Sequence, residues 1–161
     1  MLRSEEGHAS HDPDVYREIG REVRIPRAAE PAFGQAFNHI QDIYADDLAF
    51  PVFAVSDGTR AYEFFAGWVE NNVTMRGTDR WQNVGLAASN GFAIGNLVRH
   101  KRITADDPLW ARARAFDREA GFLIVDRLAE FYANLRDNPA PAAFLGDVQT
   151  LAGLMTKAAD A

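Results

Sequence analysis

The segment 107–135, DPLWARARAFDREAGFLIVDRLAEFYANL, carries the strongest structural pattern in the chain. It opens with Asp107-Pro108, which favours a helix start because an aspartate caps backbone N–H groups and proline fits the first helical turn. Apolar residues then recur at helical spacing: Leu109, Ala113, Phe116, Ala120, Leu123, Leu128, Phe131 and Leu135. We therefore predict that residues 108–135 form the longest helix, which Asn138-Pro139 ends. Trp110, Val125 and Tyr132 widen its apolar surface beyond one stripe.

Shorter segments on both sides of this one are also helical in pattern. Asp12-Pro13 predicts a helix to about residue 23, and Pro31 begins another, which Asp46-Asp47 and Pro51 should end. A further helix starts near residue 60, and residues 74–78 weaken or interrupt it. Ser89-Asn90-Gly91 reads as a turn before a short helix over residues 92–102, and a last helix covers about 141–157.

No segment alternates apolar and polar residues in the manner of a strand, so the sequence predicts an all-α fold. A chain of 161 residues has the usual length of one domain. We expect a single-domain globular helical bundle of six or seven helices over residues 12–161. Residues 1–11 are polar and aperiodic, and we expect a flexible N-terminal tail there.

Composition excludes several functional classes. The net charge of −6 argues against nucleic acid and anionic membranes as partners, since both require clustered Lys and Arg. The absence of cysteine removes disulfides, thiolate metal sites and cysteine nucleophiles. The first residues contain no apolar signal region, and the longest aliphatic run is too short to span a bilayer, so a cytoplasmic protein is expected.

The chain offers few catalytic or metal-binding patterns, and its catalytic residues stay unknown. His8-x-x-His11 is a possible metal pair in the tail. The acidic pairs Asp46-Asp47 and Asp106-Asp107 are candidate acid/base groups, although their positions at helix boundaries favour capping. His39 lies on an apolar flank and is either a core histidine or a ligand or base.

His100 is the most informative single residue. It follows Ile94 and Leu97 near the end of a short predicted helix, where a histidine is stabilised by the helix dipole. In the segment His100-Lys-Arg-Ile-Thr-Ala-Asp-Asp107-Pro108, a histidine precedes a bend and a long helix that opens with Asp-Pro. This arrangement resembles the proximal side of a globin, whose histidine ligates haem iron.

Other residues extend the resemblance to the globin superfamily over roughly residues 31–158. Phe50 and Phe53 fall at the corner where globins place aromatic residues against haem. Asn71 falls where the distal histidine or glutamine would lie, which is a departure from the family. The resemblance implies His100 as the axial metal ligand. Physically, a haem pocket also needs aromatic walls, which Phe37, Phe50, Phe53 and Phe65 could supply.

Three functions remain open on the sequence. The first is a haem-binding protein for small-gas binding, redox chemistry or sensing. The second is a non-catalytic accessory or regulatory subunit, in which the second apolar surface of segment 108–135 packs on a helical partner or on its own copy. The third is an enzyme with an apolar pocket and a carboxylate or His39 as its base.

Overall fold

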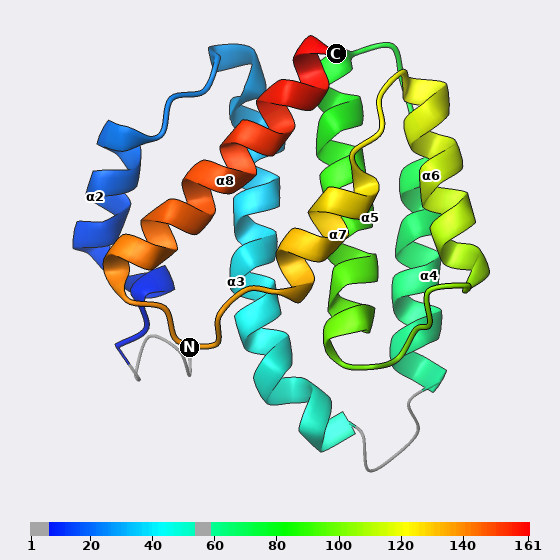
Figure 1. Cartoon of the computed structure of the whole chain (residues 1–161), viewed down its shortest axis with the longest axis horizontal. Helices are drawn as coiled ribbons and strands as arrows, with labels where there is room; N and C mark the ends of the chain where they lie inside the picture. Colours follow the sequence, from blue (N-terminus) through cyan, green and yellow to red (C-terminus); the bar gives the residue numbers. More distant parts are fainter. Residues whose placement is uncertain (1–6, 54–58) are drawn as a thin grey trace.

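The computed structural model describes residues 7–53 and 59–161, which contain seven α-helices, two short 3-10 helices and no strand (Figure 1). The all-α prediction is confirmed. The α-helices are α2 (Pro13–Glu22), α3 (Glu30–Phe53), α4 (Thr59–Thr74), α5 (Arg80–Arg99), α6 (Pro108–Ala120), α7 (Val125–Ala133) and α8 (Pro141–Asp160). The 3-10 helices are η1 (Ala9–His11) and η2 (Arg27–Ala29). Within the described residues, no helix combines the length and apolar character that crossing a membrane requires.

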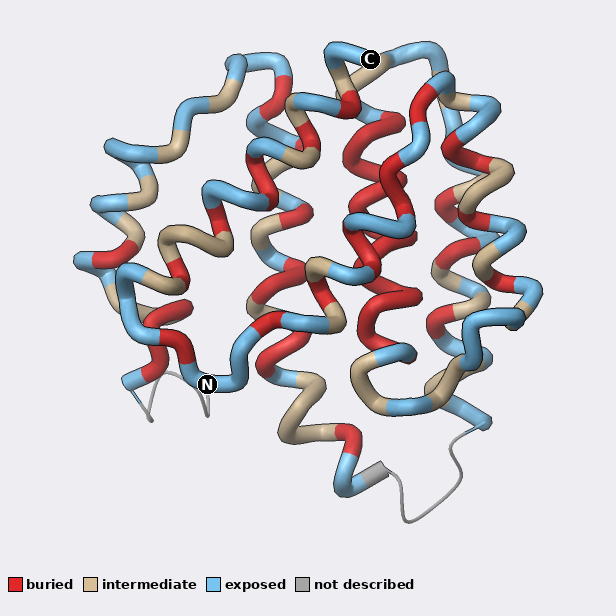
Figure 2. Tube along the Cα trace, viewed as in Figure 1, coloured by how far each residue is buried: buried red, intermediate tan, exposed pale blue. Residues whose placement is uncertain are grey.

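Helix α5 runs through the middle of the fold, and its neighbours α3, α4, α6, α7 and α8 surround it (Figures 1 and 2). Every residue from Asn83 to Leu97 is buried. A helix that is covered on all sides has no solvated face, so it shows no amphipathic pattern. This explains why the predicted turn at Ser89-Asn90-Gly91 is wrong: these residues lie inside α5 and face other helices rather than water.

Glycines on α5 let its backbone touch helix α7. A Cβ atom at Gly91 would overlap the Cβ of Leu128, and one at Gly95 would lie 2.6 Å from the carbonyl oxygen of Ala129. Such distances are below van der Waals contact, so neither position accepts a larger residue without moving α7.

The segment 108–135 is two helices, so the prediction of one long helix is wrong. Gly121 ends α6 in the left-handed conformation, with φ of +86°. The buried carboxylate of Asp117 then accepts the N–H groups of Ile124 (2.6 Å) and Val125 (2.7 Å), which begins α7 in a new direction. Trp110 therefore belongs to α6, and Val125 and Tyr132 belong to α7, instead of widening the stripe of one helix. The longest helix of the described residues is α3.

Two further expectations need correction. Helix α3 continues through Asp46-Asp47 and past Pro51, which lies in its last turn, instead of ending before them. The tail predicted for residues 1–11 is not a tail over residues 8–11: His8 is buried, and its Nε2 contacts the carbonyl oxygen of Asp137 at 3.0 Å. The other ring nitrogen of His8 hydrogen-bonds Ser10 (2.7 Å), so neither nitrogen is free for the metal pair considered with His11.

The crossing of α5 and α7 generates a stability prediction. Gly91→Ala and Gly95→Ala should each lower the free energy of unfolding by about 1–3 kcal/mol, because the added methyl group overpacks the crossing. Gly153→Ala, on the exposed side of α8 where an added Cβ meets nothing within 4 Å, should be neutral or stabilising by up to about 1 kcal/mol. Urea denaturation measures all three. Wild-type stability in both α5 variants would contradict the close approach.

Candidate functional site

The structure brings three of the predicted haem-pocket residues together. The His100 ring lies 3.8 Å from the Phe50 ring with the planes 6° apart, and Phe50 in turn faces Phe65 at 6.4 Å. Phe37 lies elsewhere, between Tyr16 (5.9 Å) and Phe144 (6.2 Å). The side chain of Phe53 is outside the described part of the structure.

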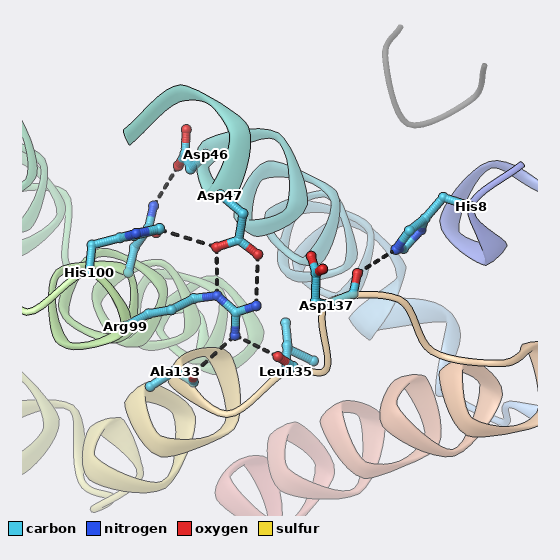
Figure 3. Close-up of polar contacts among 9 residues, drawn as sticks. His8, Asp46, Asp47, Arg99, His100, Ala133, Leu135 and Asp137 are labelled. Carbon is cyan, nitrogen blue, oxygen red and sulfur yellow. Dashed lines mark hydrogen bonds and ion pairs between the residues drawn. The ribbon is translucent and has the colours of Figure 1, made fainter. Parts of the chain in front are cut away.

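His100 is held in an ion-pair cluster at the carboxyl end of α5 (Figure 3). Its Nε2 lies 3.2 Å from Oδ1 of Asp47, a side chain of α3. The Arg99 guanidinium makes two bonds of 2.7 Å to the same carboxylate and also donates to the carbonyl oxygens of Ala133 (3.1 Å) and Leu135. One arginine thus ties α3 and α5 to the end of α7, which is a structural role.

The cluster shifts the pKa values of its two carboxylates, Asp46 and Asp47, in opposite directions. Burial alone raises the pKa of Asp47, but the close contact with His100 and the hydrogen bonds from Arg99 outweigh it and lower this pKa to about 2. Burial raises the pKa of Asp46 against the hydrogen bond that Asn96 donates to it. Asp47 is therefore an ionised partner of Arg99, with His100 beside it, rather than a proton donor or acceptor for chemistry.

This arrangement does not fit a haem site. An axial histidine needs an unengaged Nε2 that faces the metal, whereas Nε2 of His100 is directed at Asp47 and one ring face is covered by Phe50. The dispersal of Phe37 removes another expected wall. Haem binding stays a prediction from the sequence that these contacts do not support.

A cavity of about 660 Å³ lies elsewhere, between the amino-terminal part of α3, one face of α4 and the amino-terminal half of α5. We call it the Trp68 cavity. It is lined by Ala28, Pro31, Ala32, Gln35, Phe64, Gly67, Trp68, Asn71, Asn72, Met75, Asp79, Trp81, Gln82, Gly85, Leu86 and Ser89. Of the residues predicted for a cofactor, it includes Asn71 alone.

Each helix contributes one face to this cavity. The lining residues Phe64, Trp68 and Asn71 of α4 and Met75, which directly follows α4, are spaced at steps of four, three and four, so they form one stripe. Phe64 and Met75 are 60% and 50% exposed, which places apolar surface at the cavity mouth. On α5, Gly85 lies close to α3, because a Cβ added there would lie 3.0 Å from the Cβ of Ala32.

The cavity floor is a buried polar network. Ser89 of α5 accepts a hydrogen bond from Nε1 of Trp68 (2.6 Å) and another from Nδ2 of Asn72 (3.0 Å). Asn72 also donates to Oδ1 of Asn90 (2.9 Å). These contacts fix the indole of Trp68 and the amide of Asn72 relative to α5, so the floor is preformed.

His39 lies behind the floor and does not line the cavity. Its ring is 4% exposed, stacks on Phe92 at 4.2 Å and meets Trp68 edge-on at 5.8 Å. Nδ1 is 3.1 Å from Asp42, while Nε2 has no hydrogen-bond partner among the described residues. The pairing is one that a general base could use, but Trp68 separates His39 from the space a substrate would occupy.

Sequence reasoning missed most of the cavity. The spacing of Phe64, Trp68, Asn71 and Met75 was available as a helical stripe that mixes aromatic and amide side chains. Ser89 could not have been found, because a Ser-Asn-Gly triplet is typical of a turn, and only tertiary packing places it inside a helix.

Fold and site together define an all-α domain with a preformed, mainly apolar cavity beside its central helix. The chain belongs to DUF5781, a family of unknown function, whose model matches residues 1–151. No curated protein matches the chain, and no solved structure does.

The cluster around Asp47 generates a pH prediction. A pKa lowered from 3.8 to about 2 in the folded state means that the carboxylate contributes stability above about pH 4, and that this contribution is lost as the pH falls from about 4 to 2. The shift corresponds to about 2 kcal/mol. Asp47→Asn should therefore lower the free energy of unfolding by about 2 kcal/mol at pH 7 and reduce its decline between pH 4 and 2.

The measurement is urea denaturation across this pH range. The control is Asp126→Asn, which breaks an exposed pair with Arg114 (2.7 Å) and should cost at most about 1 kcal/mol. If Asp47→Asn kept the wild-type stability and acid profile, the ion pair of Asp47 with Arg99 would not stabilise the packing of α3 against α5.

Proposed function

We propose that this chain binds a small, mainly apolar molecule in the Trp68 cavity. The observation that carries the proposal is a 660 Å³ space with aromatic walls, exposed side-chain amides in its lining and a hydrogen-bonded floor. This volume lies within the range of small-molecule sites, which combine apolar linings with a few placed polar groups.

The floor itself is closed to a ligand, because Ser89 is 0% exposed and its hydroxyl oxygen accepts hydrogen bonds from Trp68 and Asn72. The polar groups that a ligand can reach are the exposed side-chain amides of Gln35, Asn71 and Gln82. Amides both donate and accept hydrogen bonds, so they can orient a ligand that carries a polar group.

The proposal is binding rather than catalysis. Asp79 is the single titratable side chain among the lining residues, and its Oδ1 already accepts the N–H of Gln82 (2.6 Å) as the cap of α5. The enzyme hypothesis with His39 as base would require Trp68 to leave its hydrogen bond to Ser89. Nothing in the site geometry favours that movement.

The structure removes much of the apolar surface on which the hypothesis of a helical partner or a second copy was based. Leu109, Phe116, Val125, Leu128 and Tyr132 are buried within the chain itself, because α6 and α7 lie in different directions. A homo-oligomer or a complex with another helical protein stays a prediction, and light scattering at micromolar concentration tests the first.

The binding test uses N-phenyl-1-naphthylamine, an uncharged probe whose fluorescence rises in apolar sites. We expect saturable binding and quenching of tryptophan emission, since Trp68 and Trp81 line the cavity. Gly67 also lines it, and an added Cβ there meets nothing within 4 Å, so larger residues should fill the cavity without disturbing the helix. The series Gly67→Ala, Leu and Trp should weaken the probe progressively, by at least about tenfold for Leu.

The matched control is Gly20→Leu. Gly20 is an exposed helical glycine of α2 with equally open surroundings, and it does not line the cavity. This variant should bind the probe within about twofold of wild type. Denaturation curves establish that each variant is folded. Equal binding by wild type and folded Gly67→Leu, or no binding by wild type, would overturn the proposal.

Haem binding is tested separately by the absorption spectrum after incubation with haemin. If His100 is the axial ligand, wild type and His39→Ala should show a Soret band with a histidine signature, and His100→Ala should lose it. Identical spectra for wild type and His100→Ala would remove His100 as the ligand. The absence of a Soret band in wild type would remove the globin-like function.

A further inference from the structure

We infer that the ligand of the Trp68 cavity is uncharged. The inference rests on the proposed binding function and adds the chemical class of the ligand. It depends on which polar groups line the cavity and on whether nearby charged side chains already bind other groups.

The polar lining consists almost entirely of groups without charge. Besides Ser89, it provides four side-chain amides, those of Gln35, Asn71, Asn72 and Gln82, and no Lys, Arg or His. Amides both donate and accept hydrogen bonds, so they serve neutral ligands without a desolvated charge. An anion placed among them would lose its hydration without gaining a counter-charge, which is costly in an apolar site.

The cations closest in sequence to the lining residues are directed elsewhere. Arg80 donates to the carbonyl oxygens of Ala120 (2.9 Å) and Ala158 (2.8 Å), which end helices α6 and α8. Arg76 pairs with Glu119 at 3.2 Å. Arg27 of η2 is exposed and is not part of the lining.

Helix ends at the cavity also disfavour an anion. The amino terminus of α5 carries a partial positive charge, but Asp79 caps it with a carboxylate. Helix α4 ends at Thr74, next to the lining residue Met75, so its partial negative end lies on the same side. A cationic ligand finds one carboxylate at most, that of the exposed Asp79, and none at the floor.

The test compares two probes with the same aromatic skeleton. N-phenyl-1-naphthylamine is uncharged, and 8-anilinonaphthalene-1-sulfonate adds one sulfonate. Competition between the two probes restricts the comparison to the shared cavity. We expect the sulfonate to bind at least about tenfold more weakly than the neutral probe to wild type at moderate salt.

A charge placed in the lining should reverse this preference. Asn71→Arg adds a cation on the α4 stripe, so the ratio of the two dissociation constants should shift towards the sulfonate by at least about fivefold. Asn138→Arg adds the same charge at an exposed position away from the cavity and should leave the ratio unchanged.

The outcomes separate the two proposals. Equal or tighter binding of the sulfonate to wild type, abolished by Gly67→Leu, would overturn the uncharged class and leave the binding function standing. A neutral probe that fails to bind would overturn the binding function itself. An equal shift in both arginine variants would show that net charge, and not the lining, sets the preference.

Discussion

The close approach of α5 to α7 at Gly91 and Gly95 is the constraint on which the rest of the fold depends. It lets one helix be surrounded by five others, because small residues keep the interaxial distance short. A helix enclosed in this way cannot turn a polar face to water. Every polar side chain on it must therefore find a partner on a neighbouring helix, and those partners set the positions of the outer helices.

The polar side chains of α5 meet that requirement at two levels. In the amino-terminal half, Ser89 joins Trp68 and Asn72 of α4. In the carboxyl-terminal half, Asn96 donates to Asp46, and Arg99 binds Asp47 of α3. The carboxyl-terminal level contains the ion pair of Arg99 with Asp47, whereas the amino-terminal level contains uncharged groups only and adjoins the cavity. The same packing requirement is thus met by an ion pair at one end of α5 and by a neutral network beside the cavity at the other.

The sequence predicted those parts of the fold that local chemistry determines. Asp12-Pro13 and Asp107-Pro108 begin helices as expected, since capping and proline act within one turn. It failed at Ser89-Asn90-Gly91 and at Gly121 for opposite reasons. The triplet is typical of a turn, but residues distant in sequence bind its polar side chains and it stays helical in the fold. Gly121 was passed over because the apolar spacing continues across the break that it makes. Burial decides both cases, and one sequence without a structure does not report it.

The candidate site shows the same division. The apolar and amide stripe of α4 follows from spacing, and Asn71 was identified as a lining residue, although for a different pocket. The partners that make His100 unavailable as a ligand, Asp47 and Phe50, lie about 50 residues away in the chain, and no local pattern links them to it. Tertiary contacts therefore move the most distinctive histidine of the sequence out of the functional site and place an inconspicuous serine in it.

Because the floor of the Trp68 cavity is held from both sides, a ligand would meet it largely as the structure shows it. Trp68 is bonded to Ser89 on one side and packed edge-on against His39 and Phe92 on the other. His39 is itself fixed by Asp42 and by its stack on Phe92. A side chain with this many restraints loses little conformational freedom on binding, which lowers the entropic cost of association. The half-exposed Phe64 and Met75 lie at the mouth, where adjustment to the shape of a ligand costs least. Rigidity at the floor and adaptability at the rim favour a site that selects the orientation and polarity of its ligand more strictly than its size.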